Sequence, residues 1–215
     1  MKKITFAIKL LAVIPLAFAL VACNPIENET TSASMLIVDN LMGEDMEGNL
    51  ANYLESDVLF EDPDEGITTI YADPAVASLT VRLLDPASLT GPSNLNSVTV
   101  DRYQVSYSRT DGRNTEGVDV PYAHEGSLSA LISVDNSRDI TFTVVRAAAK
   151  AEPPLVDLHT GRDLGVITCT AKVVFFGKDI TGRAVKATGY LTIHFANYAN
   201  TSGGSAASAA GSKIQ

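Results

Sequence analysis

Two segments near the C-terminal end of the chain alternate between apolar and polar residues. In residues 166–176 every second side chain is apolar, and most of the side chains between them are Thr or Lys. Residues 185–195 show the same alternation. A period of two residues is typical of a strand with one buried face. The intervening segment begins at Gly177 and ends at Gly182, so we predict a turn there and a long antiparallel hairpin.

The rest of the chain is also predicted to form short strands joined by turns. Pro153 and Pro154 end any helix that begins in the alanine-rich segment before them, so we expect a crossover turn over residues 147–158. Further strands are expected at residues 35–40, 58–61, 67–72, 76–84, 98–109, 128–134 and 140–145. The predicted fold class is therefore all-β, as a single antiparallel β-sandwich over residues 35–198.

The strand spacing resembles that of immunoglobulin-like domains. The Cys–Trp–Cys core of antibody domains is missing, because the chain has no Trp. The resemblance therefore concerns the architecture alone and implies an immunoglobulin-like arrangement of the two sheets.

The first residues have the layout of an export signal. Lys2 and Lys3 precede an apolar run over residues 10–22. The run is shorter than the roughly 20 residues of a membrane-spanning helix and matches the apolar region of a signal peptide. An uncleaved membrane helix starting at Ile4 is the alternative.

The end of this signal resembles the lipobox of bacterial lipoproteins, with Leu20, Val21, Ala22 and Cys23 in the required order. The resemblance implies that residues 1–22 are removed and that Cys23 carries a thioether-linked diacylglycerol. Two or three acyl chains hold a protein stably on a bilayer, at about 0.8 kcal/mol per buried CH₂. In enteric bacteria an Asp after the cysteine favours the inner membrane. Asn24 stands there, which favours the outer membrane if the host has one.

Composition changes at both ends of the predicted domain. Residues 23–34 are polar and are expected to form a flexible tether. Residues 199–215 form a low-complexity tail that we expect to be disordered.

The formal net charge of the chain is −9, although the signal contributes three lysines. An acidic mature protein is unsuited to nucleic acid, so membrane contact is expected through the lipid on Cys23.

No combination of residues in the sequence indicates catalysis. His124 and His159 are expected in loops and His194 on an exposed strand face, so each is predicted to be solvated. Cys169 and His194 lie on opposite faces of the predicted hairpin and cannot share a proton. With Cys23 committed to lipid, Cys169 is a lone thiol that should be buried or paired between molecules, and the alternation favours a small apolar residue of the core. We therefore predict that the protein is not an enzyme.

Acidic turn sequences in the first part of the domain offer hard oxygen ligands. A calcium site is one interpretation, and a solvated acidic surface is the other and the preferred one, because neither cluster has EF-hand spacing. No other cofactor is expected. The two clusters consist of Asp45, Glu47 and Asn49, and of Asp62, Asp64 and Glu65.

The favoured function is a lipid-anchored protein of the cell envelope whose β-sandwich binds a protein partner or joins an assembly. The long loop over residues 110–126, with Tyr122 and His124, is the candidate contact surface, and an ordinary connection is the alternative. A carbohydrate-binding or carbohydrate-active module is the second hypothesis. It depends on an exposed aromatic such as Tyr190, and the absence of Trp counts against it.

The same loop resembles a segment of uncharacterised bacterial lipoproteins. The shared residues are Asp111, Gly112, Arg113 and Asn114, followed by the run from Gly117 to Tyr122. This resemblance covers most of the mature chain and implies no activity.

Overall fold

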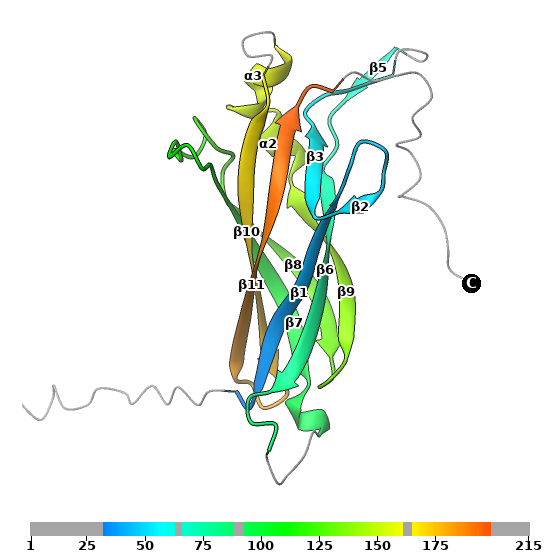
Figure 1. Cartoon of the computed structure of the whole chain (residues 1–215), viewed down its shortest axis with the longest axis vertical. Helices are drawn as coiled ribbons and strands as arrows, with labels where there is room; N and C mark the ends of the chain where they lie inside the picture. The colour runs from blue at the N-terminus through cyan, green and yellow to red at the C-terminus, as the bar shows by residue number, and fades with distance from the viewer. Residues whose placement is uncertain (1–31, 63–65, 88–92, 161–164, 199–215) are drawn as a thin grey trace, which may run out of the picture. The chain divides into compact units, whose positions relative to one another are not determined.

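The structure is a computed structural model that describes residues 32–62, 66–87, 93–160 and 165–198 (Figure 1). The predicted signal, Cys23, most of the predicted tether and the predicted tail lie outside the described residues. The last part of the predicted tether belongs to the fold, because Ser32 and Ser34 are buried. The Ser32 hydroxyl donates to Asp179 Oδ2 at 2.7 Å.

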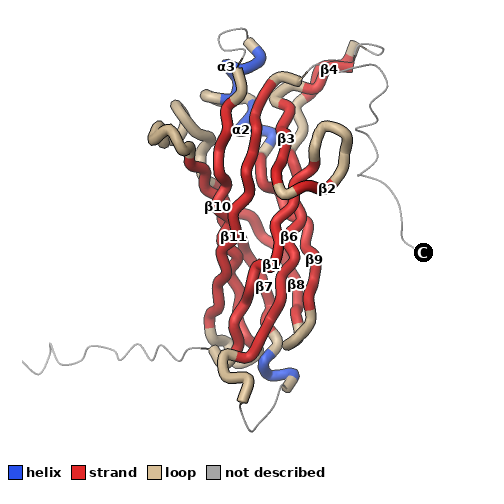
Figure 2. The backbone as a smooth tube through the Cα atoms, viewed as in Figure 1, coloured by secondary structure: helices blue, strands red, loops and turns tan. Residues whose placement is uncertain are grey.

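Most of the described chain is strand, which confirms the all-β class (Figure 2). A four-stranded sheet has the order β2-β1-β6-β9, and its strands are β1 Ser34–Glu44, β2 Leu50–Ala51, β6 Asp73–Leu83 and β9 Ser137–Val145. A five-stranded sheet has the order β3-β11-β10-β7-β8, and its strands are β3 Tyr53–Asp57, β7 Val98–Ser108, β8 His124–Ile132, β10 Ile167–Asp179 and β11 Ala184–Ala196. A small hairpin pairs β4 Phe60–Asp62 with β5 Ile67–Thr69.

The core lies between the two larger sheets, where their apolar faces meet. Phe142 of β9 packs edge-on against Phe175 of β10, with ring centroids 5.3 Å apart. Tyr103 of β7 lies 5.0 Å from Phe142. The Tyr107 hydroxyl donates to Val144 O at 2.6 Å, so a polar group within the core also has a partner. Every second residue of β10 is buried, as the alternation predicts.

One pair of strands departs from the predicted antiparallel arrangement, because β3 pairs with β11 in parallel from Tyr53 to Asp57. The cause is a change of sheet without a change of direction. Strand β2 ends at Ala51 in the four-stranded sheet, and after a single bend at Asn52 the chain enters the five-stranded sheet as β3. The immunoglobulin-like arrangement stays a prediction.

Several strands are longer than the sequence pattern indicates. The first strand runs from Ser34 to Glu44 rather than over 35–40, with an irregularity between Val38 and Asn40. Strand β6 begins at Asp73 and therefore contains Pro74, which has no N–H for the ladder. The register shifts between Asp73 and Pro74, and such a bulge accommodates proline.

Gly177 was expected in a turn but lies inside β10. The register of β10 against β7 shifts between Phe176 and Gly177. A Cβ atom at position 177 would lie 2.5 Å from Thr99 O, so only glycine permits this close approach of two strands.

Two short helices replace the expected crossover turn, α2 Ala147–Lys150 and α3 Leu155–His159. The prolines end α2 as predicted, but Pro154 also precedes the first residue of α3, a place in which a fixed φ is tolerated. Among the described residues, no helix has the length and apolar character needed to cross a membrane.

A core substitution tests the packing of the two sheets. Phe175 is fully buried, whereas its neighbour Phe176 faces the other side of the sheet under Arg102 and is half-buried. We expect Phe175→Ala to lower the free energy of unfolding by about 3–5 kcal/mol. The matched variant Phe176→Ala should lower it by on the order of 1 kcal/mol. Urea denaturation measures both, and equal losses would contradict this assignment of faces.

Candidate functional site

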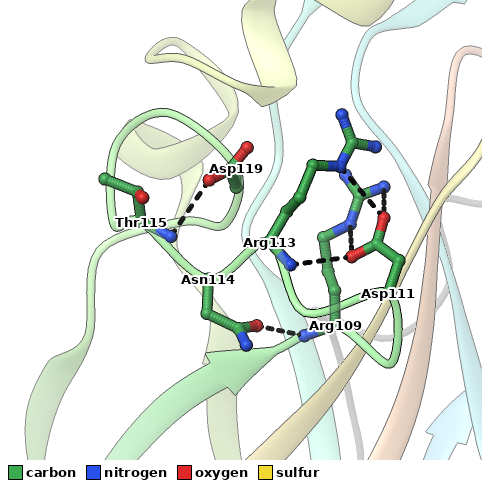
Figure 3. Close-up of polar contacts among 6 residues, drawn as sticks. All are labelled: Arg109, Asp111, Arg113, Asn114, Thr115 and Asp119. Carbon is green, nitrogen blue, oxygen red and sulfur yellow. Dashed lines mark hydrogen bonds and ion pairs between the residues drawn. The ribbon is translucent and has the colours of Figure 1, made fainter.

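The loop between β7 and β8 is ordered by one carboxylate, that of Asp111 (Figure 3). Arg109 donates to it from Nε at 3.2 Å and from Nη2 at 2.6 Å. Arg113 donates from its backbone N–H at 3.1 Å and from Nε at 3.1 Å. Charge-assisted, forked hydrogen bonds of this kind fix both side chains as well as the backbone. The two guanidinium groups are therefore held on the same side of the loop.

The arginines act on the acidity of this carboxyl. The hydrogen bond from Arg109 is the largest cause, and together with the contacts from Arg113 it lowers the pKa of Asp111 to about 2. Asp111 is accordingly ionised at neutral pH. The Arg109 side chain is 15% exposed, whereas the Arg113 side chain is 63% exposed. Arg113 is thus the guanidinium of the pair that solvent or a partner reaches most easily.

The second half of the loop closes on itself. Thr115 O accepts from the N–H groups of Val118 and Asp119 at 3.1 and 2.8 Å, and the Thr115 N–H donates to Asp119 Oδ2 at 3.1 Å. Gly117 has φ of 73°, and the Tyr122 ring lies where its Cβ would be. Tyr122, predicted as a contact residue, is therefore a packing partner of the loop that keeps 48% of its surface exposed.

A pocket of about 370 Å³ lies between this loop, the start of α3 and the start of β10. Val118 and Val166 give it an apolar part, and both are more than half exposed. Charged groups of both signs surround them. The lining residues are Arg109, Arg113, Val118, Asp119, Pro154, Asp157, Gly165, Val166 and Ile167. The pocket can therefore combine apolar contact with hydrogen bonding and ion pairing.

The structure keeps Cys169 and His194 apart, as the alternation predicts. Cys169 is 1% exposed and pairs in register with Ile193. His194 pairs with Thr168, whose hydroxyl lies 3.0 Å from its Nδ1. Burial raises the pKa of the Cys169 thiol to about 11, so the thiolate is scarce at neutral pH. The two side chains form no nucleophile–base pair.

The prediction of solvated histidines is wrong for His124 and for His159. His124 begins β8 instead of lying in a loop, and it is 8% exposed with Nε2 3.3 Å from Thr143 O. Burial lowers its pKa. His159 ends α3 and is half-buried, and its Nε2 is a buried atom with no partner among the described residues. Both were mispredicted because a loop was assigned to their segments.

The carboxylate of Asp45 accepts hydrogen bonds from the backbone of its own turn. Asp45 Oδ1 accepts from the backbone N–H groups of Glu47 and Asn49 at 2.9 and 2.8 Å. These bonds are among the causes that lower the pKa of Asp45. Asp64 and Glu65 of the second predicted cluster lie outside the described residues. Over the part of the chain that the structure describes, no group of three His, Cys, Asp or Glu side chains is arranged to hold a metal ion. Calcium binding stays an untested alternative.

Tyr190 lies where the carbohydrate hypothesis needs it, on the outer face of β11 and 63% exposed. It stands opposite Lys172 in the ladder. It is not among the residues that line the pocket. The structure thus places Tyr190, the candidate sugar-binding residue, outside the candidate contact surface.

A buried polar cluster was not predicted at all. The Lys150 side chain is 1% exposed, and its Nζ donates to Asp73 Oδ1 at 2.6 Å and to Asp57 O at 2.7 Å. The Ser56 hydroxyl donates to Asp73 Oδ2 at 2.6 Å. The one signal in the sequence was a single lysine within an alanine run. Its partners are too far away along the chain for any local pattern to indicate them.

No family model matches the chain, and no curated protein matches it. Among solved structures, it is similar to a cycloisomaltooligosaccharide glucanotransferase of Paenibacillus sp. complexed with cycloisomaltoheptaose. That similarity covers 76% of this chain and 15% of the other, at 11% identity and a TM-score of 0.33. A likeness this distant carries no argument about activity.

The acidity of Asp111 provides a test of the loop. Its pKa is about 2 in the folded protein and near 3.8 when unperturbed, so its ion pairs stabilise the fold fully above pH 3.8. That contribution is lost as the pH falls toward 2. The urea midpoint of the wild type should therefore fall more steeply over this range than that of Asp111→Asn. Parallel pH profiles for the two proteins would show that the arginines do not hold the carboxylate.

Proposed function

We propose that the chain is a lipid-anchored protein of the cell envelope whose β-domain binds a protein partner or joins an assembly. Binding is supported by one observation above all, the pocket at which Val118 of a self-ordered loop and Val166 before β10 lie beside Arg109 and Arg113. Exposed apolar side chains surrounded by fixed polar groups are characteristic of protein interfaces. A loop that is already ordered loses little conformational entropy when it binds.

A protein partner fits this pocket better than a glycan does. Sugar rings are commonly held against exposed aromatic faces, and the pocket is lined by charged and aliphatic residues together with glycine and proline. The exposed aromatic Tyr190 lies away from that lining. A carbohydrate-binding module, which would use Tyr190, is the second candidate.

Crosslinking in intact cells tests the contact surface. The lipidated protein is crosslinked and recovered, and we expect one specific protein partner whose yield falls at least about tenfold in Val118→Asp or Val166→Asp, because a buried unpaired charge is costly at an interface. Ile180→Asp is the matched control, since Ile180 is equally apolar and 52% exposed but follows the opposite end of β10. Equal recovery from all variants, or recovery of soluble glycan that depends on Tyr190, would contradict the proposal.

The anchor is tested separately through the two cysteines. Cys23→Ser should move the protein from the membrane fraction to the soluble fraction and abolish labelling by radioactive palmitate, since no acyl chains remain to hold it. Cys169→Ser changes a buried side chain and should leave both readouts unchanged. A Cys23→Ser protein that stays in the membrane would indicate the uncleaved N-terminal helix instead.

A further inference from the structure

Lys150 is a buried cation in direct contact with a carboxylate. It ends α2, directly after the crossover leaves β9, and its Nζ is in hydrogen-bond contact with Asp73 Oδ1 and Asp57 O. A buried ammonium is costly unless its charge is matched within the protein. The short contact between Lys150 and Asp73 also brings an amine nitrogen next to a carboxyl carbon. The two groups are those that an amide bond joins.

The carboxyl of Asp73 is held at both oxygens. Oδ1 accepts from Lys150 Nζ at 2.6 Å, and Oδ2 accepts from Ser56 Oγ at 2.6 Å. When a nucleophile adds to a carboxyl carbon, negative charge develops on an oxygen, and a fixed hydroxyl donor stabilises that charge. Ser56 is fully buried and lies next to Asp57, so the donor belongs to the same end of β3. The geometry therefore supplies both a nucleophile and a donor.

A second carboxyl, that of Asp57, lies near enough to Lys150 and Asp73 for their charges to act on it, while Lys150 Nζ itself contacts the Asp57 backbone oxygen. Asp57 Oδ1 accepts from the N–H of Tyr198 at 3.2 Å, while Oδ2 is buried with no hydrogen-bond partner among the described residues. Burial raises the pKa of both Asp57 and Asp73, and the charge of Lys150 opposes the rise in each. A half-buried acid with one buried oxygen that lacks a partner among the described residues is suited to take up and release a proton.

We propose that Lys150 and Asp73 join in an intramolecular isopeptide bond, with Asp57 as the proton relay. The ammonium of Lys150 passes a proton to Asp57, and the neutral Nζ attacks Asp73 Cγ. The Nζ–Cγ bond forms, and one Cγ–O bond breaks. The departing oxygen leaves as water and takes two protons that were bound to Nζ at the start. Asp57 carries one of these protons to the oxygen and is thereby returned to its starting protonation state. The positive and negative charges of the pair cancel, and no oxidant or other reactant is needed.

Position favours this condensation. Groups held in contact react as if at very high concentration, and the 1% exposure of the Lys150 side chain and 15% exposure of the Asp73 side chain leave bulk water little access for the reverse hydrolysis. The bond would close a loop of 77 residues and fasten the crossover covalently to the start of β6. A cross-link between distant parts of a chain restricts the unfolded state, as a disulfide does. It would strengthen a domain that has no disulfide within its described part.

Digestion of the full-length wild-type protein with trypsin tests the bond. Trypsin cleaves after Arg146, Lys150 and Arg162, so an unlinked chain yields separate peptides 147–150 and 151–162. An acylated Lys150 resists cleavage. We expect peptide 147–162 joined to the peptide that ends at Arg82, lighter than their sum by one water. Cyanogen bromide cleavage after Met46 removes the predicted lipidated end before mass spectrometry.

Three variants assign the roles. Lys150→Arg keeps a positive charge but has no nucleophilic amine, and Asp73→Ala removes the carboxyl, so each should give only unlinked peptides. Asp57→Asn should leave the domain folded by circular dichroism and the peptides unlinked. Linked peptides from Asp57→Asn would overturn its assignment as the relay. Free peptide 147–150 in stoichiometric yield from the wild type would overturn the bond itself. The bond would also be overturned if the only peptide lighter by one water were the one that contains Asp111 and Gly112, which lies outside the expected cross-link.

Discussion

The charge of Lys150 has to be balanced inside the domain, and the position of the crossover beside the candidate site depends on how that is done. Asp73 at the start of β6 and Asp57 at the end of β3 supply the partners. Breaking such a pair by removing one member leaves an uncompensated buried charge, which is strongly destabilising. The contact therefore fixes where the crossover begins, and the crossover carries Pro154 and Asp157 to the wall of the pocket. The contact at Lys150 thereby contributes to the position of two residues that line the pocket.

Two further polar groups of the described domain have assigned surroundings. The buried thiol of Cys169 has no base beside it, and the ionised carboxylate of Asp111 is occupied by two arginines. Arg113, Val118 and Val166 are well exposed around one pocket and are available to a partner. Such an arrangement favours binding by a preformed surface.

The sequence patterns correctly predicted those features of the fold that depend on residues close together in the chain. Alternation was sufficient to identify β10 and β11 and to place Cys169 in the core, because each strand buries every second side chain. The parallel pairing of β3 could not be predicted, because it depends on which sheet the chain enters after Asn52. The burial of Lys150 was missed for the same reason, since its partner Asp73 is 77 residues away. The arginine contacts of Asp111 were missed because hydrogen bonds across a turn leave no periodic signal.

Amide hydrogen exchange measures directly whether the contact surface exists before a partner arrives. The N–H groups of Arg113, Thr115 and Val118 donate within the loop, and that of Val156 donates within the crossover. A preformed surface predicts that these amides exchange slowly in the free wild-type protein. It also predicts that exchange at Val156 rises in Lys150→Met, whose crossover is no longer fastened. Rapid exchange at all four amides in the wild type would contradict a preformed surface.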